Sequence, residues 1–405
     1  MERCINLPTD NIKNAIENIA KREKFVDYRV TVSSGSEKGD NFLGIIFRVK
    51  IEENGKSENK QPLHLIIKTP PDETMRNVIP INKFYGMEVH VYSVIFPALN
   101  TLQEYAKIPE NQCFKLAKCF GCCSQNLLEF LALEDLNVRG FKMFDRLKSF
   151  DYEHMTLIVN KLANYHALSY AMKEKQPANF RQLSESVINS QKFTESSGNM
   201  FDESFARAVM VMKDPLSAER LKKFSVNLLG KLNDFLDNDG KDRTFNIITH
   251  GDCWCNNFVF NYEGEKPVDV IFLDWQLVRY ASPITDLAYL IFTSTDEEFR
   301  GKYLENIMEE YHKALGLRLA LLGCDVNKCY PVEIYKQHTK EKLLIGLLWS
   351  MVVIPLSSGS KEDVIDLGDV VGANNRIGSN EVKISEAAVE RMNGVVKDFI
   401  KFGMI

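Results

Sequence analysis

The sequence lacks the features that would assign it to several large classes of protein. Its formal net charge is −5, whereas proteins that bind nucleic acid present a basic face to phosphates, so we expect no nucleic-acid partner. The first ten residues contain no apolar stretch typical of a signal peptide. The longest apolar run, 343–356, is too short for a membrane span and indicates a buried helix. We therefore expect a cytoplasmic protein without a membrane partner.

Cysteine is not scarce, but its distribution argues against two kinds of site. The nine cysteines are an odd number spread over the whole chain, which is not the pattern of a secreted disulfide framework. Cys119, Cys122 and Cys123 lie close together, but no second pair of Cys or His follows at zinc spacing, so we expect no zinc there. Nothing in the sequence indicates that the thiol of Cys253 or Cys255 is activated.

Composition and apolar periodicity together predict an α+β fold. With 45% hydrophobic and 26% charged residues, the 405 residues can form a sizeable core, in two or three domains or in one bilobal unit. An apolar stripe predicts one long helix over 82–99, with Pro97 near its end. The later chain is mostly helical, so we predict a small N-terminal β-sheet lobe, 1–135, and a larger mainly helical lobe, 136–405. Alternating apolar residues predict five strands in the first lobe: 28–32, 42–51, 63–68, 113–121 and 127–133.

The most informative stretch is a polar loop that follows a short predicted strand, 244–248. His250, Gly251, Asp252 and Asn257 fit the pattern H-G-D-x-x-x-x-N. Phosphoryl transfer needs a carboxylate near the attacking hydroxyl and oxygen ligands for Mg²⁺, and kinases use the related H-R-D-x-x-x-x-N for this work. Both residues also have common structural roles, the Asp in a turn and the Asn as a helix cap. The pattern favours the catalytic interpretation.

A second carboxylate follows at the distance that this interpretation requires. Asp274 comes directly after a predicted hairpin, formed by 258–262 and 268–273, and 22 residues after Asp252. Kinases place there the Asp that binds the metal bridging the ATP phosphates. We therefore predict that Asp252, Asn257 and Asp274 converge on one cleft.

The first lobe contains candidates for the other half of an ATP site. Lys68 ends an apolar strand, and Glu88 lies on the following helix twenty residues later. Each alone is usually a solvated surface charge, but in this order they match the lysine and glutamate that kinases pair near the phosphates. The turn 33–44 can cover phosphates with backbone N–H groups, although it does not match G-x-G-x-x-G.

With these residues in place, the chain resembles the ecdysteroid kinase-like family of insects, also called CHK kinase-like proteins. This family is related to the aminoglycoside phosphotransferases and choline kinases. The resemblance covers nearly the whole chain and implies a protein-kinase-like bilobal fold, with ATP-dependent phosphorylation of a small-molecule hydroxyl. It rests on Lys38-Gly39-Asp40-Asn41, Leu65-Ile66-Ile67-Lys68, Glu88 with Tyr92 and Pro97, Leu133-Glu134-Asp135-Leu136, His166-Ala167-Leu168-Ser169, His250-Gly251-Asp252-Cys253-Trp254-Cys255-Asn256-Asn257, Asp274-Trp275-Gln276, and Ser282-Pro283-Ile284-Thr285-Asp286-Leu287-Ala288.

Carried over by position, the resemblance assigns a role to each central residue. It implies that Asp252 is the catalytic base and that Asn257 and Asp274 bind Mg²⁺. It also implies that Lys68, held by Glu88, anchors the phosphates of ATP.

The resemblance extends the nucleotide site and assigns two supporting residues. Gly39 and Asn41 would lie at the phosphates, and Glu134 and Leu136 would lie where the connection between the lobes meets the adenine. We expect Asp286 to brace the backbone of the catalytic loop rather than to react. His166 is expected to be a hydrogen-bonded core residue.

Two positions depart from the pattern of the family. Trp275 stands where Phe is common after the metal-binding Asp, which keeps an aromatic ring. Gly44 stands where Ser is common, which removes one hydrogen bond to phosphate.

The acceptor is less well defined than the reaction. The resemblance favours an ecdysteroid or another steroid alcohol, with a hydroxylated or glycosylated xenobiotic as an equal alternative, which would make the protein a detoxifying enzyme. Choline or ethanolamine is a further alternative. A ligand-binding pseudokinase would have lost at least one central residue, yet all are present. A protein kinase is disfavoured because H-G-D replaces H-R-D and no A-P-E follows. The polar segment 357–380 is either a lid or a plain surface loop, and the oligomeric state is left open.

Overall fold

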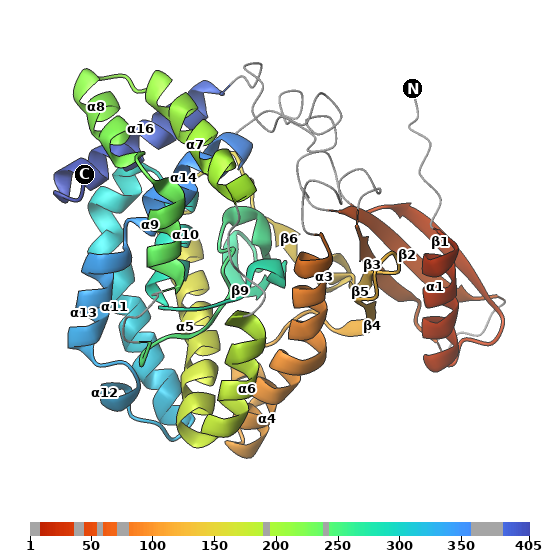
Figure 1. The fold of residues 1–405 in the computed structure, drawn as a ribbon. Coiled ribbons are helices and arrows are strands. Elements are labelled where there is room, and N and C mark those ends of the chain that lie inside the picture. Colours follow the sequence, from red (N-terminus) through yellow and green to blue (C-terminus); the bar gives the residue numbers. More distant parts are fainter. Residues whose placement is uncertain are drawn as a thin grey trace.

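The computed structural model describes residues 9–35, 44–54, 60–70, 81–188, 195–237, 243–357 and 384–405. Its N-terminal part is a five-stranded antiparallel sheet in the order β1-β2-β3-β5-β4. Helix α1 (Asp10–Arg22) packs on this sheet through an apolar cluster that includes Ile12, Ile16 and Ile19 (Figure 1). The strands are β1 (Tyr28–Ser34), β2 (Ile45–Glu53), β3 (Leu63–Thr69), β4 (Cys119–Cys123) and β5 (Phe130–Glu134).

The long helix of this part continues beyond its predicted end. It comprises α3 (Ile81–His90), a π-helical turn (Val91–Ile95) and α4 (Phe96–Tyr105). The prediction that it ends at residue 99 was wrong, because Pro97 does not terminate it. In the π-helical turn the backbone N–H of Phe96 donates to the carbonyl of Val91, five residues back, and Pro97 then occupies the first turn of α4, where its missing N–H is tolerated.

The C-terminal part is a bundle of helices around three buried ones. Helices α5 (Tyr152–Lys175), α10 (Ile284–Ser294) and α14 (Ile345–Ser357) are each buried over much of their length. The buried α14 confirms the interpretation of the apolar run 343–356. Around them lie α6 (Pro177–Ile188), α7 (Glu195–Met210), α8 (Pro215–Phe224), α9 (Leu228–Asp237), α11 (Glu297–Leu321), α12 (Val326–Cys329), α13 (Val332–Lys342) and α16 (Glu386–Lys401).

Two small sheets position the loops of interest. Strand β7 (Ile247–Thr249) pairs with β10 (Arg279–Ala281), and β8 (Phe258–Glu263) pairs with β9 (Lys266–Phe272) and with the short β6 (Lys142–Met143). The predicted hairpin is thus confirmed. The strand predicted over 244–248 is shorter and begins at Ile247, and the one predicted over 113–121 begins only at Cys119.

The main apolar core joins both parts of the chain. It includes side chains of α3 and α4, such as Met87 and Leu99, together with those of the central helices. After β5, a 3₁₀ turn (Leu136–Arg139) capped by Asp135 connects the sheet to the helical part. The division into 1–135 and 136–405 stays a prediction, because side chains from both segments share this core.

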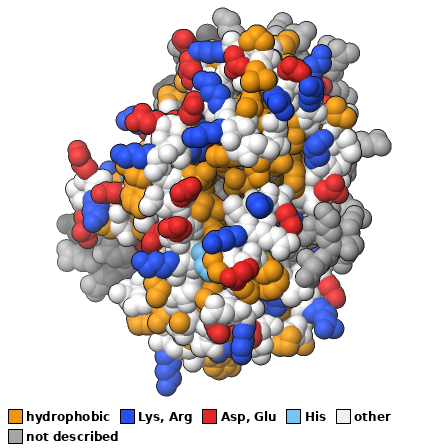
Figure 2. Space-filling view, turned by 90° about the vertical axis from the view of Figure 1, so that its left-hand side faces the viewer, with side chains coloured by type: hydrophobic (Ala, Val, Ile, Leu, Met, Phe, Trp, Pro, Cys, Tyr) orange, Lys and Arg blue, Asp and Glu red, His pale blue; other side chains and the backbone are white. Residues whose placement is uncertain are grey.

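The outer helical face combines apolar and charged side chains. Helices α11 and α13, at the left in Figure 1, line a hollow of about 370 Å³. Figure 2 shows this side of the molecule, with hydrophobic side chains gathered among Lys, Arg, Asp and Glu. Within the described residues, no helix has both the length and the apolar character that crossing a membrane requires.

Candidate active site

The H-G-D loop has a backbone shape that only its own glycine permits. Gly251 adopts a positive φ of 82°, and a Cβ built there would lie 1.8 Å from the carbonyl oxygen of Leu277. Any other residue would clash with that backbone and would also be strained at this φ. Gly251 therefore allows the loop to pack closely against the turn that follows Asp274.

Asp286 holds the same loop in place, as predicted. Its Oδ2 accepts the backbone N–H of His250 at 2.7 Å, and its Oδ1 accepts that of Gly251 at 2.8 Å. His166 Nε2 lies 3.1 Å from Oδ2, and its Nδ1 lies 2.7 Å from the hydroxyl of Tyr311. Burial alone would raise the pKa of Asp286, but the hydrogen bond and charge of His166 and the loop N–H groups lower it below its usual value. Asp286 thus braces the loop and His166 is a satisfied core residue.

Asp252 is oriented by two neighbouring side chains. The hydroxyl of Tyr289 donates to Oδ1 at 2.8 Å, and the amide Nδ2 of Asn257 donates to Oδ2 at 2.8 Å. Burial and the nearby carboxylate of Asp274 raise the pKa of Asp252 to about 6, although both hydrogen bonds act in the opposite direction. A carboxylate with a pKa near the working pH is well suited to accept a proton.

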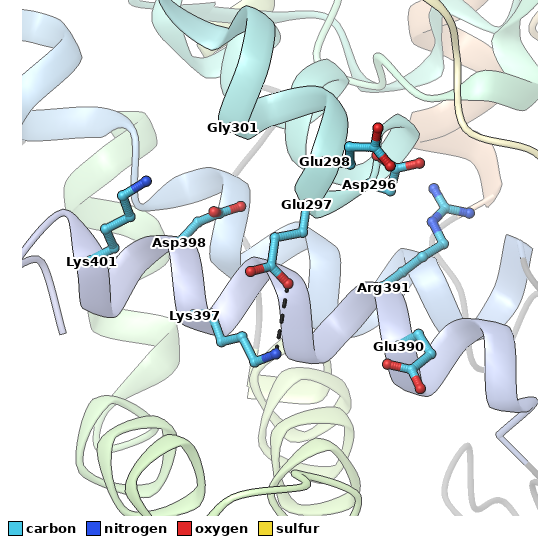
Figure 3. Close-up of a pocket in the computed structure, with 9 residues that line it drawn as sticks. All are labelled: Asp296, Glu297, Glu298, Gly301, Glu390, Arg391, Lys397, Asp398 and Lys401. Carbon is cyan, nitrogen blue, oxygen red and sulfur yellow. Dashed lines mark ion pairs between the residues drawn. The ribbon is translucent and has the colours of Figure 1, made fainter.

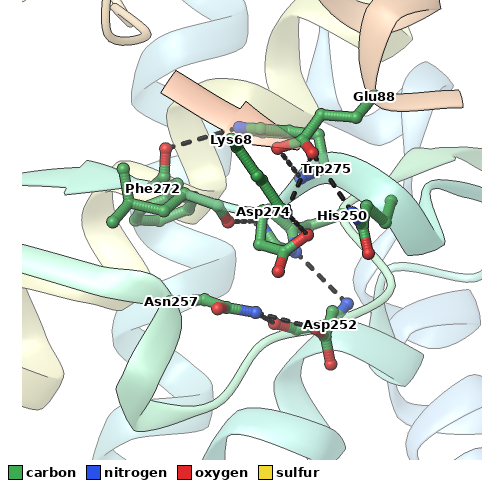
Figure 4. A network of polar contacts seen from close by, with 10 residues as sticks. Lys68, Glu88, His250, Asp252, Asn257, Phe272, Asp274 and Trp275 are labelled. Carbon is green, nitrogen blue, oxygen red and sulfur yellow. Dashed lines mark hydrogen bonds and ion pairs between the residues drawn. The ribbon is translucent and has the colours of Figure 1, made fainter. Parts of the chain in front are cut away.

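Lys68 connects the sheet to the two carboxylates that the sequence singled out. Its Nζ lies 3.0 Å from Glu88 Oε2 and 3.0 Å from Asp274 Oδ1. Burial would lower the pKa of Lys68, but Asp274 and Glu88 raise it above its ordinary value, so the ammonium stays charged. Figure 4 shows Asp274 between the Lys68–Glu88 pair and the Asp252–Asn257 pair. The structure therefore brings together all five central residues.

The residues after β9 hold Asp274 in an uncommon conformation. Asp274 has φ 58° and ψ 75°, in the left-handed region that side-chain-bearing residues rarely adopt. The next residue, Trp275, donates its backbone N–H to Glu88 Oε1 at 3.3 Å, and the ring of Trp275 is fully buried. Such strained residues persist only where their surroundings fix them, and they cluster at functional sites. The helix that carries Glu88 thus helps to set the position of Asp274.

Two further predicted nucleotide residues, Glu134 and Leu136, make their contacts outside this cluster. The carboxylate of Glu134 accepts from Arg139 at 3.0 Å and from the backbone N–H of Lys118 at 2.9 Å. Leu136 is buried at the start of the 3₁₀ turn. Both lie at the connection after β5, where the sequence placed them, and their role toward adenine stays a prediction. Gly39 and Asn41 fall outside the described residues.

Tyr289 is the functional candidate that the sequence reasoning missed. It lies on α10, three residues after Asp286, so that one helix face presents both the bracing carboxylate and a hydroxyl for Asp252. The ring of Tyr289 stacks on Trp349 of α14 with centroids 4.8 Å apart and planes at 7°. The helical spacing after Asp286 was the available signal, but pairing with Asp252 depends on the fold.

We expect Tyr289→Phe to reduce turnover about tenfold near neutral pH. The change removes one hydrogen bond to a charged group, worth about 1.5 kcal/mol, while the stacked ring remains. Initial rates at saturating substrates would measure it. Tyr105→Phe, at an exposed tyrosine of α4, is the matched control. An unchanged rate for Tyr289→Phe would show that its hydroxyl does not orient Asp252.

The two thiols of the H-G-D loop are not activated. Cys253 and Cys255 are both buried, and burial is the main cause that raises the pKa of each, to about 11 for Cys255. Both are therefore protonated at neutral pH, which disfavours nucleophilic or redox roles.

A separate charged cavity lies away from these residues. Its volume is about 860 Å³, and it lies between the start of α11 and α16. Figure 3 shows Glu297 of α11 paired across it with Lys397 of α16, at 3.7 Å. None of the predicted site residues lines it. The lining residues are Asp296, Glu297, Glu298, Gly301, Glu390, Arg391, Lys397, Asp398 and Lys401.

Comparison with known protein families identifies one match. The model of the ecdysteroid kinase-like family matches residues 38–324, which include all five residues of the cluster. Among curated protein sequences, none matches the chain.

Several solved structures are similar over most of their length, at low identity. An ethanolamine kinase of Plasmodium vivax is 13% identical, with 93% of this chain and 83% of that chain covered and a TM-score of 0.42. A spectinomycin phosphotransferase in complex with ADP and spectinomycin is 12% identical, with coverages of 97% and 98% and a TM-score of 0.43. The GDP complex of an aminoglycoside 2′-phosphotransferase is 11% identical, with coverages of 96% and 100% and a TM-score of 0.44.

Proposed function

The chain belongs to the ecdysteroid kinase-like family and is a phosphotransferase with an alcohol group as acceptor. We propose that it transfers the γ-phosphoryl group of ATP, with Mg²⁺ bound. The proposed acceptor is a hydroxyl of an ecdysteroid, another steroid alcohol or a xenobiotic. The observation that carries the proposal is the cluster itself. A charged lysine bound to one proposed metal ligand, Asp274, lies beside a base with a raised pKa that is bound to the other, Asn257. Phosphoryl transfer requires this combination.

The residues present fit the proposed metal. Mg²⁺ prefers oxygen ligands, and Asp274 offers a carboxylate while Asn257 offers an amide oxygen. Asn257 directs its Nδ2 toward Asp252, with a second hydrogen bond of 2.9 Å to the carbonyl oxygen of that residue. Its amide oxygen therefore turns away from Asp252. When bound, Mg²⁺ would neutralise charge on the phosphate oxygens.

The roles of the side chains in the reaction follow from their contacts. Asp252 would accept the proton of the acceptor hydroxyl, and Tyr289 and Asn257 hold its carboxylate in a fixed orientation. Lys68 would bind the phosphates of ATP, and Glu88 holds its ammonium by a contact of 3.0 Å. Asp286 fixes the loop that carries Asp252 through two backbone N–H groups. Proton transfer and positioning thus depend on separate residues.

The family match supports a neutral alcohol as the acceptor. Behind Asp252, the ring of Tyr289 stacks on Trp349, which meets the ring of Phe201 edge-on at 5.3 Å. These three rings are buried, so they support the position of the Tyr289 hydroxyl that donates to Asp252. The preference for a steroid alcohol or a xenobiotic over choline or ethanolamine therefore rests on the family.

Mass spectrometry of acceptors incubated with protein, ATP and Mg²⁺ tests the proposal. The set contains an ecdysteroid, a simple sterol, a glycosylated phenol, choline and ethanolamine. We expect a product heavier by one phosphoryl group with the neutral alcohols and none with the two cations. Phosphorylation of ethanolamine or choline alone would contradict the proposed acceptor class, and a chain that binds no ATP would contradict the kinase activity.

A further inference from the structure

A second cluster of side chains lies at the end of the helical bundle, away from the proposed active site. Among the residues that the structure describes, one group of three Cys and Glu side chains has all its ligand atoms within 4.8 Å of one another: Glu174, Cys324 and Cys329. Cys329 Sγ lies 3.0 Å from Glu174 Oε2, although the two residues are 155 positions apart. The fold therefore brings two thiols and a carboxylate together.

The local structure fixes the two cysteines. Helix α11 ends at Leu321, and Gly323 follows with a positive φ of 68° and donates to the carbonyl of Ala320. This turn places Cys324 two residues before the start of α12 (Val326), and Cys329 is the last residue of that single-turn helix. The two thiols thus lie at either end of one helical turn, with their sulfur atoms close together.

Helix α5 supplies the third group. It packs along α11, so that its last turn, with Glu174, reaches the turn between α11 and α12 (Figure 1). Cys324 is buried, Cys329 is half-buried and Glu174 is exposed. A cation bound here would have protein ligands on one side and solvent on the other.

We propose that Glu174, Cys324 and Cys329 form a zinc site that ties the end of α5 to the turn between α11 and α12. Zinc takes thiolate and carboxylate ligands at about 2.3 and 2.1 Å, and a tetrahedral arrangement then separates the ligand atoms by about 3.6 to 3.8 Å. Cys329 Sγ and Glu174 Oε2 are 3.0 Å apart, and all three ligand atoms lie within 4.8 Å of one another, so shifts of no more than about 1 Å would produce this geometry. Water completes the fourth position, as in other zinc sites with three protein ligands.

The ligand set selects zinc over the commoner hard cations. Two sulfur ligands and one carboxylate suit a thiophilic metal, whereas Mg²⁺ and Ca²⁺ require oxygen ligands throughout. The proposal also differs from a zinc site at Cys119–Cys123, which the spacing in the sequence disfavours. It is independent of the phosphotransferase reaction, because none of the three residues belongs to the site described above.

Binding here would act on a segment that leads to the catalytic loop. The residue after Cys329, Tyr330, has its hydroxyl 2.9 Å from His338 Nδ1, and Ser282 Oγ lies 2.9 Å from the same nitrogen. Ser282 begins the turn into α10, which carries Asp286 and Tyr289. Because the three ligands come together only in the folded chain, zinc would bind that state preferentially and raise its thermal unfolding midpoint.

Metal analysis of the purified full-length chain tests the proposal. We expect one zinc per chain by elemental mass spectrometry, or one equivalent taken up after chelation, and a cobalt-substituted protein with thiolate-to-cobalt absorption. Glu174→Gln, an exposed substitution that leaves the fold intact, should weaken zinc binding at least about tenfold. The double variant Cys324→Ser/Cys329→Ser should abolish zinc binding. The double variant Cys119→Ser/Cys122→Ser is the matched control and should bind zinc normally.

Three results would overturn the proposal. The first is a chain that takes up no zinc while all three side chains are intact. The second is zinc binding that is unchanged in Glu174→Gln and in the cysteine variants, because the metal would then bind elsewhere. The third is a disulfide between Cys324 and Cys329 in the protein purified from a reducing cytoplasm, detected by peptide mapping after alkylation.

Discussion

Asp252→Asn is expected to reduce turnover by about 10²- to 10⁴-fold, the usual contribution of general acid–base catalysis. The amide keeps the size of the side chain and can still accept a hydrogen bond from Tyr289, but it cannot take up the proton of the acceptor. Nucleotide affinity should change little, because Lys68 and Glu88 keep their contact. Initial rates and nucleotide titrations on the same preparation would separate the two effects.

Asp10→Asn is the matched control for this change. Asp10 is an exposed carboxylate at the start of α1, and its ion-pair partner is Lys13 on the same helix. This variant should retain wild-type turnover. If Asp252→Asn kept more than a tenth of the wild-type rate, Asp252 would be a positioning residue, and another group would accept the proton.

The chemistry of the site could be predicted from the sequence because it depends on residue types in a fixed order. The sequence predicts Lys68 from a strand end, Glu88 from the following helix, and Asp252, Asn257 and Asp274 from the H-G-D pattern and the hairpin after it. In the structure Lys68 lies 3.0 Å from both Glu88 and Asp274, and Asn257 lies 2.8 Å from Asp252. The strand, the polar loop and the hairpin are joined by short connections, which keep the polar residues that follow them near one another. Local pattern and global fold agree here, which is typical of a functional loop on a rigid scaffold.

Features that depend on contacts between distant segments could not be predicted. The hydroxyl of Tyr289 meets Asp252 only because α10 packs beneath the catalytic loop. Glu174 meets Cys329 only because α5 and α11 run side by side. The continuation of the long helix past Pro97 depends on a π-helical turn, which a single proline in the sequence does not reveal.

Backbone strain was equally hidden from the sequence. The positive φ of Asp274 places its carboxylate toward Lys68, yet nothing in Leu273-Asp274-Trp275 indicates a left-handed residue. The surroundings impose it, since the backbone N–H of Trp275 donates to Glu88 and the ring of Trp275 fills the core. Asp274, whose backbone is held in this left-handed conformation, is also a proposed ligand of Mg²⁺.

Asp274→Asn should be at least as damaging as the loss of the base, with turnover reduced by about 10³-fold or more. A metal that stabilises charge on the phosphoryl group contributes several kcal/mol, and each 1.4 kcal/mol corresponds to a factor of ten. The amide is a weaker ligand than the carboxylate, so half-saturation by Mg²⁺ should move to a higher concentration. Lys68 retains Glu88 as its partner, and the fold should therefore persist. Rates over a Mg²⁺ titration, with circular dichroism to verify folding, would measure both effects.

Asp269→Asn controls for this change on the same strand, because Asp269 of β9 pairs with Lys161 away from the cluster. It should leave both the rate and its Mg²⁺ dependence unchanged. The titration separates two roles of Asp274. If the metal dependence of Asp274→Asn matched the wild type while the rate fell, Asp274 would act only through the charge of Lys68, and the metal ligand would have to be sought among other oxygen-bearing residues.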